Sequence, residues 1–297
     1  MRFAIPTFPG RDGLTLNWAM AMLMAILYGP LLAHWADGWI HRSLSPYHDY
    51  FSHGLIGLPV AACMAWEQRT VWQTLDNRCH PGGWLCVLLA AGLYLTRLPA
   101  WMSLSFPLML VGLCLCLKSK PGLRLAAVPL VLVALATPLP WPYLIEPYIL
   151  PLQKGVAATA GFLLTQFGVN ASVQEIYLYV NGQTVEVAPH CAGLKILFTS
   201  LYVALILLYW TRAWTSKLQM TLFLAGTVGV SVMGNIIRNA LLAYFYGNKW
   251  LGAFDWLHEG WGGDVYSTLV LLGLIGLLQG IQRWVPQSLQ IRSSSSL

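Results

Sequence analysis

The sequence predicts an all-α polytopic membrane protein of about seven to eight transmembrane helices, built as one integral-membrane domain over residues 1–297. Of the residues, 57% are hydrophobic and only 9% are charged, whereas soluble domains carry about 25% charged residues. The mean hydropathy is +0.60. Separate apolar runs of about 20 residues, enough to cross a bilayer, are spread along the whole chain. This spread favours a multipass domain over a soluble domain with one anchor.

The charged and metal-binding residue types limit the functional classes. The net charge of +6 comes from basic residues that stand singly between apolar runs, so they are expected to set membrane orientation rather than to bind nucleic acid. The six cysteines form no C-x-x-C pair, and the four histidines between residues 34 and 53 lack the H-E-x-x-H spacing. We therefore expect no metal, no other cofactor and no disulfide framework.

Eight apolar segments are the candidates for membrane spans. Between the first two lies an aromatic and polar segment, 37–53, which is typical of an interfacial loop. The fifth must end at Pro138-Leu139-Pro140-Trp141-Pro142, because proline lacks a backbone N–H. The serine-rich tail, 285–297, is expected to be disordered. The segments cover residues 16–35, 54–66, 83–98, 101–117, 125–139, 191–210, 218–246 and 265–281, and residues 247–263 are expected to form a loop.

The segment between the fifth and sixth spans has a different pattern. Residues 143–167 mix prolines and polar groups with apolar ones, which predicts an interfacial or re-entrant helix. Two β-rich runs, 176–180 and 183–187, flank Asn181-Gly182. This dipeptide suits a type I′ turn, so we expect a short extracytoplasmic β-hairpin.

The basic residues predict the orientation. With the N-terminus in the cytoplasm and residues 140–170 not crossing, 11 of the 17 basic residues face the cytoplasm. A further crossing within residues 143–168 would reverse everything downstream or require the N-terminus outside the cytoplasm. The cytoplasmic set is Arg2, Arg11, Arg69, Arg78, Lys118, Lys120, Arg124, Arg212, Lys217, Arg283 and Arg292.

Cys191 is the candidate nucleophile. It follows Pro189-His190 at the predicted first turn of the sixth span, where unpaired N–H groups and the helix dipole stabilise a thiolate. Lys195, four residues on and so on the same predicted helical face, would lower the thiol pKa further. The alternative is a small buried side chain chosen for packing.

Two distant residues are predicted on the same membrane face as Cys191. Arg238 lies in the outer half of the seventh span, and a membrane-embedded arginine costs about 2.5–3.5 kcal/mol, which favours a functional role. The alternative is an arginine near a helix end whose side chain snorkels toward the interface. His258 lies in the following predicted loop and is a candidate base; His190, beside the cysteine, is its rival. Asn235, one turn before Arg238, is expected to orient that side chain, line the site or bond between helices.

These residues resemble the exosortase/archaeosortase family of membrane cysteine transpeptidases. The matching motifs are Ala188-Pro189-His190-Cys191-Ala192-Gly193-Leu194, Gly234-Asn235-Ile236-Ile237-Arg238 and Leu257-His258-Glu259-Gly260-Trp261, with a looser match at Phe51-Ser52-His53-Gly54. Ala192 is a departure, because many members have serine there. The resemblance extends over nearly the whole chain.

The resemblance implies a bacterial inner-membrane enzyme with its active site on the extracytoplasmic face. Its expected partners are membrane lipid and exported proteins whose C-terminal sorting signal, called PEP-CTERM, has a Pro-Glu-Pro motif, a transmembrane helix and a basic tail. Cys191 would form a thioester, His258 would act as base, and Arg238 would stabilise the oxyanion or the substrate. Lys195 and Arg238 are expected to attract the glutamate of the motif, and Asn235 to help bind substrate.

Two other functions compete with this prediction. One is a transporter whose Arg238 binds an anion, although the sequence shows no inverted repeat. The other is a membrane acyltransferase that uses a histidine and the aromatic segment after Asp37. Activity that does not depend on Cys191 would favour either alternative.

Overall fold

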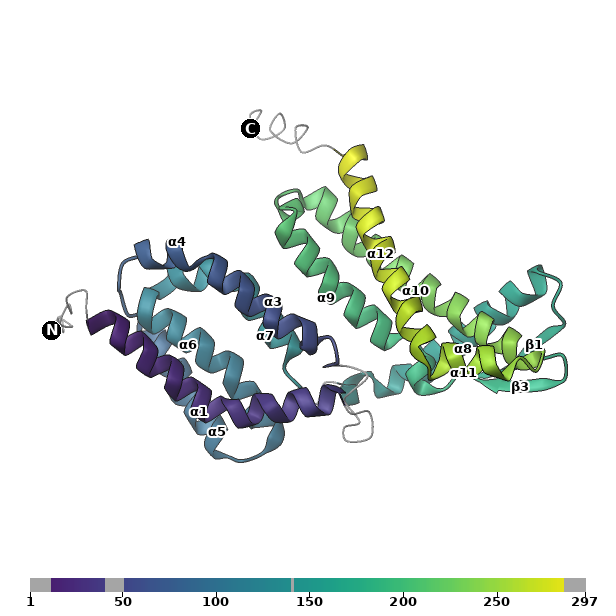
Figure 1. The fold of residues 1–297 in the computed structure, drawn as a ribbon, viewed down its shortest axis with the longest axis horizontal. Helices are drawn as coiled ribbons and strands as arrows, with labels where there is room; N and C mark the ends of the chain where they lie inside the picture. Colours follow the sequence, from purple (N-terminus) through teal and green to yellow (C-terminus); the bar gives the residue numbers. More distant parts are fainter. Residues whose placement is uncertain (1–11, 41–50, 140–141, 286–297) are drawn as a thin grey trace. The chain divides into compact units, whose positions relative to one another are not determined.

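A computed structural model describes residues 12–40, 51–139 and 142–285. The chain divides into two compact units, shown in Figure 1: residues 1–48 with 54–139, and residues 49–53 with 140–297. The prediction of one integral-membrane domain spans both units and stays a prediction. Several predicted features lie outside the described residues: Arg2, Arg11, Arg292, most of the predicted interfacial loop and nearly all of the predicted disordered tail.

The first unit consists of helices, of which α5 (Pro81–Leu95) and α6 (Pro99–Leu125) pack against each other along their length. Prolines at the first turns of α5 and α6 fit a position that needs no N–H donor. The two helices approach closely at Gly112, where an added Cβ would lie 2.8 Å from a side-chain carbon of Val87. Ser119, with φ 55° and ψ −152°, kinks α6. The helices are α1 (Asp12–Ile40), α3 (Gly54–Glu67), α4 (Arg69–Thr74), α5 (Pro81–Leu95), α6 (Pro99–Leu125) and α7 (Ala127–Ala136).

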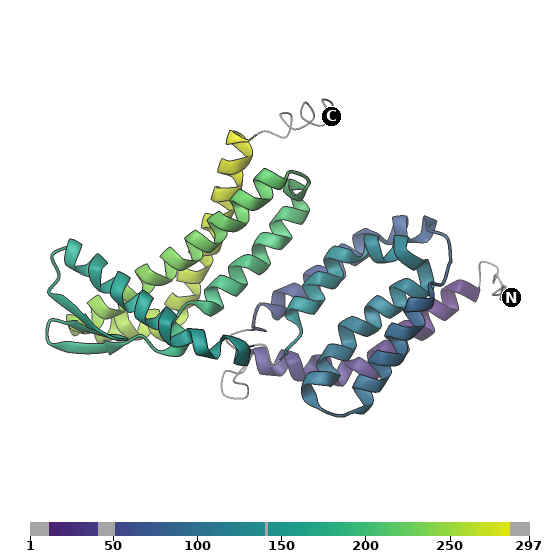
Figure 2. The same cartoon turned by 180° about the vertical axis from the view of Figure 1, so that it is seen from behind.

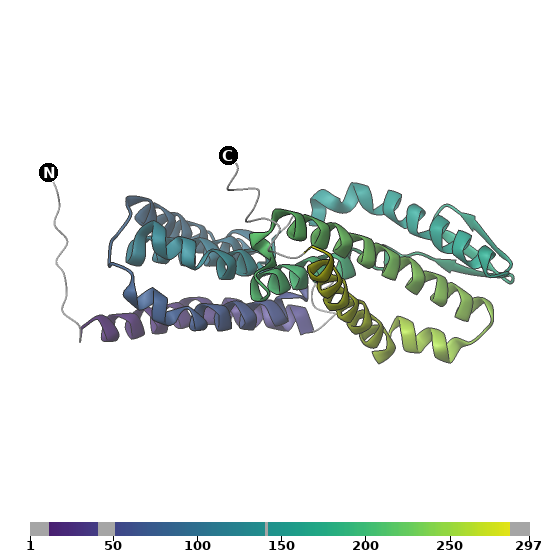
Figure 3. The same ribbon diagram turned by 90° about the horizontal axis from the view of Figure 1, so that it is seen from above.

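The second unit is organised around one long helix, α10. Figures 1 and 3 show α9 and α12 beside one part of it, and α8 and the strands beside its C-terminal half. Buried side chains of α9, α10 and α12 form one core, including Phe223 and Leu274, which are both fully buried. The helices are α8 (Pro142–Gln166), α9 (Leu194–Trp210), α10 (Lys217–Gly247), α11 (Leu251–His258) and α12 (Trp261–Trp284).

A small antiparallel sheet packs against α8 and α10, as Figure 2 shows from behind. The predicted hairpin is confirmed: β2 (Tyr177–Val180) pairs with β3 (Gln183–Glu186), and Asn181 and Gly182 both have positive φ. The sequence did not predict β1 (Ala171–Gln174), which pairs with β2. Leu178 and Val180 are fully buried, so the sheet turns its apolar face to the helices.

Among the described residues, four helical segments are long and apolar enough to cross a membrane: Pro99–Leu125, Pro189–Trp210, Lys217–Gly247 and Trp261–Trp284. Together with three shorter apolar helices, they make the chain an all-α membrane protein, as predicted. The predicted number of seven to eight crossings stays a prediction. The predicted second span, 54–66, corresponds to α3, which ends at Glu67, and α4 follows as a separate helix. Residues 247–263 are not wholly a loop, because they contain α11.

Candidate active site

Three of the predicted site residues meet in the second unit. Cys191 ends a short 3₁₀ turn, Pro189–Cys191, that links the sheet to α9. Just before it, the buried side chain of Gln153 in α8 donates to the main-chain carbonyl of Val187 and anchors the linker. Arg238 lies in α10, and His258 is the last residue of α11. The turns and short helix between the long helices therefore bring residues from three parts of the sequence to one end of the bundle.

The Cys191 thiol and the His258 imidazole form a close pair. Sγ lies 3.9 Å from Nε2, within reach of a sulfur hydrogen bond. The other ring nitrogen, Nδ1, lies 3.7 Å from a carboxylate oxygen of Glu259. The ring of Phe254 stacks on the imidazole, with centroids 5.1 Å apart and planes 15° from parallel. With the ring stacked on Phe254, Nε2 faces the thiol, an arrangement suited to proton transfer.

His190, the rival base, lies close to this pair, in the same 3₁₀ turn as Cys191. One ligand atom each from His190, Cys191 and His258 lie within 4.8 Å of one another. His190 is exposed whereas Cys191 is only 4% exposed, so His190 forms the outer edge of the cluster.

Two asparagines of α10 hold the main chain of the cysteine. The side-chain amides of Asn235 and Asn239 each donate to the carbonyl oxygen of Cys191, both at 3.0 Å. Asn239 also donates to the carbonyl of Asn235, at 2.9 Å. Both asparagines are 4% exposed. Asn235 thus contacts the main chain of the candidate nucleophile. Asn239 was not predicted from the sequence; its signal was the i, i+4 spacing, which places both asparagines on one helical face.

Gly193 lies between α9 and the pair Asn235 and Asn239, which we call the asparagine clamp. Its φ of +99° is in the left-handed region, which costs a residue with a side chain about 1–2 kcal/mol. An added Cβ would lie only 2.6 Å from Nδ2 of Asn235. The glycine of the Cys191-Ala192-Gly193 motif is therefore required by both its backbone conformation and the close approach of the clamp.

Arg238 contacts the main chain at the end of α11, where His258 lies, rather than the main chain of Cys191. Its Nη2 donates to the main-chain carbonyls of Leu257, at 3.3 Å, and His258, at 3.4 Å. These carbonyls end α11, where a positive charge is favourable. The guanidinium thus fixes the backbone of His258. Its predicted contact with an oxyanion or a substrate stays a prediction.

Contrary to the sequence prediction, Lys195 does not lie on one helix with Cys191, and its predicted effect on the thiol pKa stays a prediction. Because α9 begins at Leu194 and Cys191 lies in the preceding 3₁₀ turn, the two residues do not share the face of one continuous helix. Lys195 is half-buried, and its predicted substrate contact stays a prediction.

The Phe51-Ser52-His53 motif belongs to the second unit. There the centroid of the buried His53 ring lies 4.7 Å from the centroid of the Tyr202 ring in α9.

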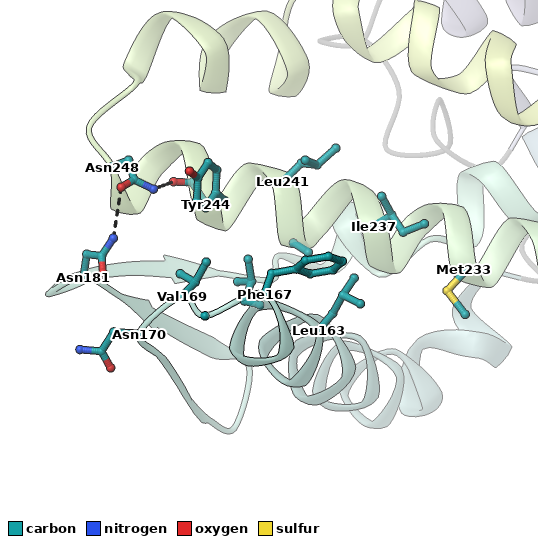
Figure 4. A pocket seen from close by; sticks show the side chains of 13 residues that line it. Leu163, Phe167, Val169, Asn170, Asn181, Met233, Ile237, Leu241, Tyr244 and Asn248 are labelled. Carbon is teal, nitrogen blue, oxygen red and sulfur yellow. Dashed lines mark hydrogen bonds between the residues drawn. The ribbon is translucent and has the colours of Figure 1, made fainter.

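A separate apolar groove of about 810 Å³ lies between α8, the start of the sheet and α10 (Figure 4). Helical periodicity places its residues Ile237 and Tyr244 on the side of α10 opposite to Asn235 and Asn239. Asn181 donates to Asn248 at one end, at 3.3 Å (Figure 4). The groove is therefore not part of the Cys191 site.

Comparison with known families identifies the family of the chain. The family model described as transmembrane exosortase matches residues 35–274, a stretch that contains the cysteine turn, the asparagine clamp, Arg238 and His258. Searches of curated proteins and of solved structures found no match. Because the match extends over most of the chain, this protein belongs to the transmembrane exosortase family.

Proposed function

We propose that this exosortase is a membrane-embedded cysteine transpeptidase that cleaves C-terminal sorting signals of exported proteins. The observation that carries the proposal is the distance of 3.9 Å between Cys191 Sγ and His258 Nε2. A nucleophile paired with an oriented base is the arrangement that acyl transfer needs. Membership of the exosortase family supports the same reaction class.

The proposed reaction has two stages. His258 takes the thiol proton, and the Cys191 thiolate attacks the scissile carbonyl to give a tetrahedral oxyanion. The oxyanion collapses to a thioester as the C–N bond breaks, and protonated His258 gives its proton to the leaving amine. An acceptor amine or water then attacks the thioester and regenerates the thiol. Arg238 stabilises the oxyanion or holds the substrate, and its anchor on the α11 carbonyls keeps it next to the histidine segment.

The proposed substrate is an exported protein with a Pro-Glu-Pro motif, one transmembrane helix and a basic tail. Basic residues favour the cytoplasmic side, so such a helix would present its motif at the outer face of the bacterial inner membrane. The proposed active site lies on that face. Arg238 and Lys195 supply positive charge for the glutamate of the motif.

Co-expression with a protein that carries such a signal tests the proposal. The mature mass of the substrate is compared in cells with the intact enzyme, with Cys191→Ala and with Cys63→Ala. Cys63 is exposed in α3, so its replacement is a matched control for loss of a thiol. We expect cleavage with the intact enzyme and the control, none with Cys191→Ala, and equal membrane levels of all three.

Equal cleavage with Cys191→Ala would contradict the proposal and favour the transporter or acyltransferase alternatives. The mass of the new C-terminus distinguishes the two outcomes of the second stage. Addition of one water indicates hydrolysis, whereas a larger added mass identifies an acceptor amine.

A further inference from the structure

We propose that His190, Cys191 and His258 form a site for a thiophilic divalent cation of the Zn²⁺ or Cd²⁺ type, and that the bound ion arrests the enzyme. The sequence spacing gave no sign of such a site, because His258 is 67 residues from Cys191. The fold brings a thiol and two imidazoles together, with one donor atom from each within 4.8 Å of the others. This inference adds regulation to the proposed function; only its inhibition clause rests on that function.

The donor spacing suits a tetrahedral ion. Zinc bonds of about 2.3 Å to sulfur and about 2.0–2.1 Å to nitrogen place the two donors about 3.6 Å apart. Sγ of Cys191 and Nε2 of His258 are 3.9 Å apart, so a shift of a few tenths of an ångström brings both to bonding distance. His190 is exposed, so its ring can rotate inward without displacing buried groups. Three protein ligands leave the fourth position to water.

A carboxylate lies near the second ring nitrogen of His258. A ligand imidazole commonly directs its second nitrogen to a carboxylate, which fixes the ring and raises its basicity. Here Nδ1 lies 3.7 Å from the Glu259 carboxylate while Nε2 faces the thiol. The negative charge of Glu259 also offsets part of the ion's charge, whereas the guanidinium of Arg238, on the carbonyls of Leu257 and His258, opposes it.

The donor set also selects the ion. One thiolate and two imidazoles favour soft and borderline ions, and carboxylate-preferring Mg²⁺ and Ca²⁺ bind poorly to such a set. Binding displaces the thiol proton into solvent and forms a metal–sulfur bond. The sulfur lone pair that would attack the scissile carbonyl is then engaged, so cleavage stops until the ion leaves.

Cadmium titration of the purified full chain tests the site without any substrate. The ultraviolet charge-transfer band of a cadmium thiolate is measured in the intact enzyme and in Cys191→Ala, and the difference removes the signal of the five other cysteines. We expect one additional cadmium–thiolate in the intact enzyme. His190→Ala should weaken its affinity about tenfold or more, because it removes one of three ligands.

Two further variants keep the titration decisive. His34→Ala removes an exposed histidine in α1 and should bind cadmium like the intact enzyme. His190→Cys supplies sulfur in place of nitrogen and should restore tight binding, which a merely misfolded variant would not do. Identical titrations for the intact enzyme and Cys191→Ala, or an unchanged affinity in His190→Ala, would overturn the proposal.

Inhibition is measured separately, as the Zn²⁺ concentration that halves each variant's own cleavage rate. We expect this concentration to rise in His190→Ala by the same factor as the cadmium affinity falls. Cadmium binding without any cleavage by the intact enzyme would contradict the proposed function and leave the metal site standing. Cleavage that is indifferent to Zn²⁺ would overturn the inhibition clause alone.

Discussion

The side-chain amide of Asn239 donates to the main-chain carbonyl of Cys191 at 3.0 Å, next to an equal hydrogen bond from Asn235. Two donors on one buried carbonyl fix the position of Cys191 without touching its sulfur. A buried carbonyl that loses all of its donors costs about 1–3 kcal/mol, whereas the loss of one of two donors costs less. The asparagines are therefore expected to act as a pair.

The asparagine pair predicts a non-additive double-mutant cycle. Asn235→Ala and Asn239→Ala should each lower the cleavage rate by roughly threefold to tenfold, and the double variant should lose more than the product of the two effects. Asn239→Asp should be worse than Asn239→Ala, because a carboxylate repels the carbonyl oxygen. Asn248→Ala, at the end of the same helix, is the matched control. Additive effects would argue against a shared clamp.

The contact between Gly193 and Asn235 predicts a steric effect of an added side chain. Comparison with Gly168 separates this effect from the backbone cost. Gly193→Ala combines a left-handed backbone with a Cβ at 2.6 Å from Asn235, so cleavage should fall about a hundredfold or more. Gly168→Ala has a φ of +76° but nothing within 4 Å of the new Cβ, and so bears only the backbone cost. Thermal melting and cleavage rates of both variants check this, and equal behaviour of the two would contradict the close contact.

The contacts of Arg238 predict that lysine cannot replace arginine at this position without a loss of cleavage rate. Arg238→Lys keeps the charge but loses the planar group that reaches two carbonyls, so cleavage should fall at least about tenfold. The exposed Arg97→Lys is the control and should be neutral. An unchanged rate in Arg238→Lys would rule out a two-pronged contact with the substrate.

Glu259 predicts only a small effect. Its side chain is 79% exposed and its carboxylate lies 3.7 Å from His258 Nδ1. Exposed ion pairs contribute about 0–1 kcal/mol, so Glu259→Gln should slow cleavage by about fivefold or less. Phe254→Ala removes the ring stacked on the imidazole and should slow cleavage more. The reverse order would show that the carboxylate, rather than the stack, orients the base.

The long apolar segments made the membrane helices predictable, and single basic residues between them predicted an orientation. That orientation was enough to expect Cys191, Arg238 and His258 on one face, and the structure places Cys191 beside His258 and Arg238 on the His258 backbone. The Asn181-Gly182 turn was equally readable, because few dipeptides accept two successive residues with positive φ.

Short elements were the ones that the sequence did not reveal. Strand β1 has four residues, three of them exposed, so it shows no hydrophobic alternation. Helix α11 has eight residues, below the length at which helical periodicity is clear. The start of α9 was placed too early because Gly193, read as part of a helix, has the left-handed φ that separates it from the cysteine turn.

The central claim is that Cys191 carries the acyl group, and the most direct measurement is the intact mass of the enzyme during turnover. Enzyme incubated with a sorting-signal substrate is quenched in acid, and its intact mass is measured by mass spectrometry with and without hydroxylamine, which cleaves thioesters. We predict an added mass equal to the N-terminal part of the substrate, released by hydroxylamine and absent in Cys191→Ala. Substrate cleavage without any enzyme-bound acyl group, at the same rate in Cys191→Ala, would contradict the account.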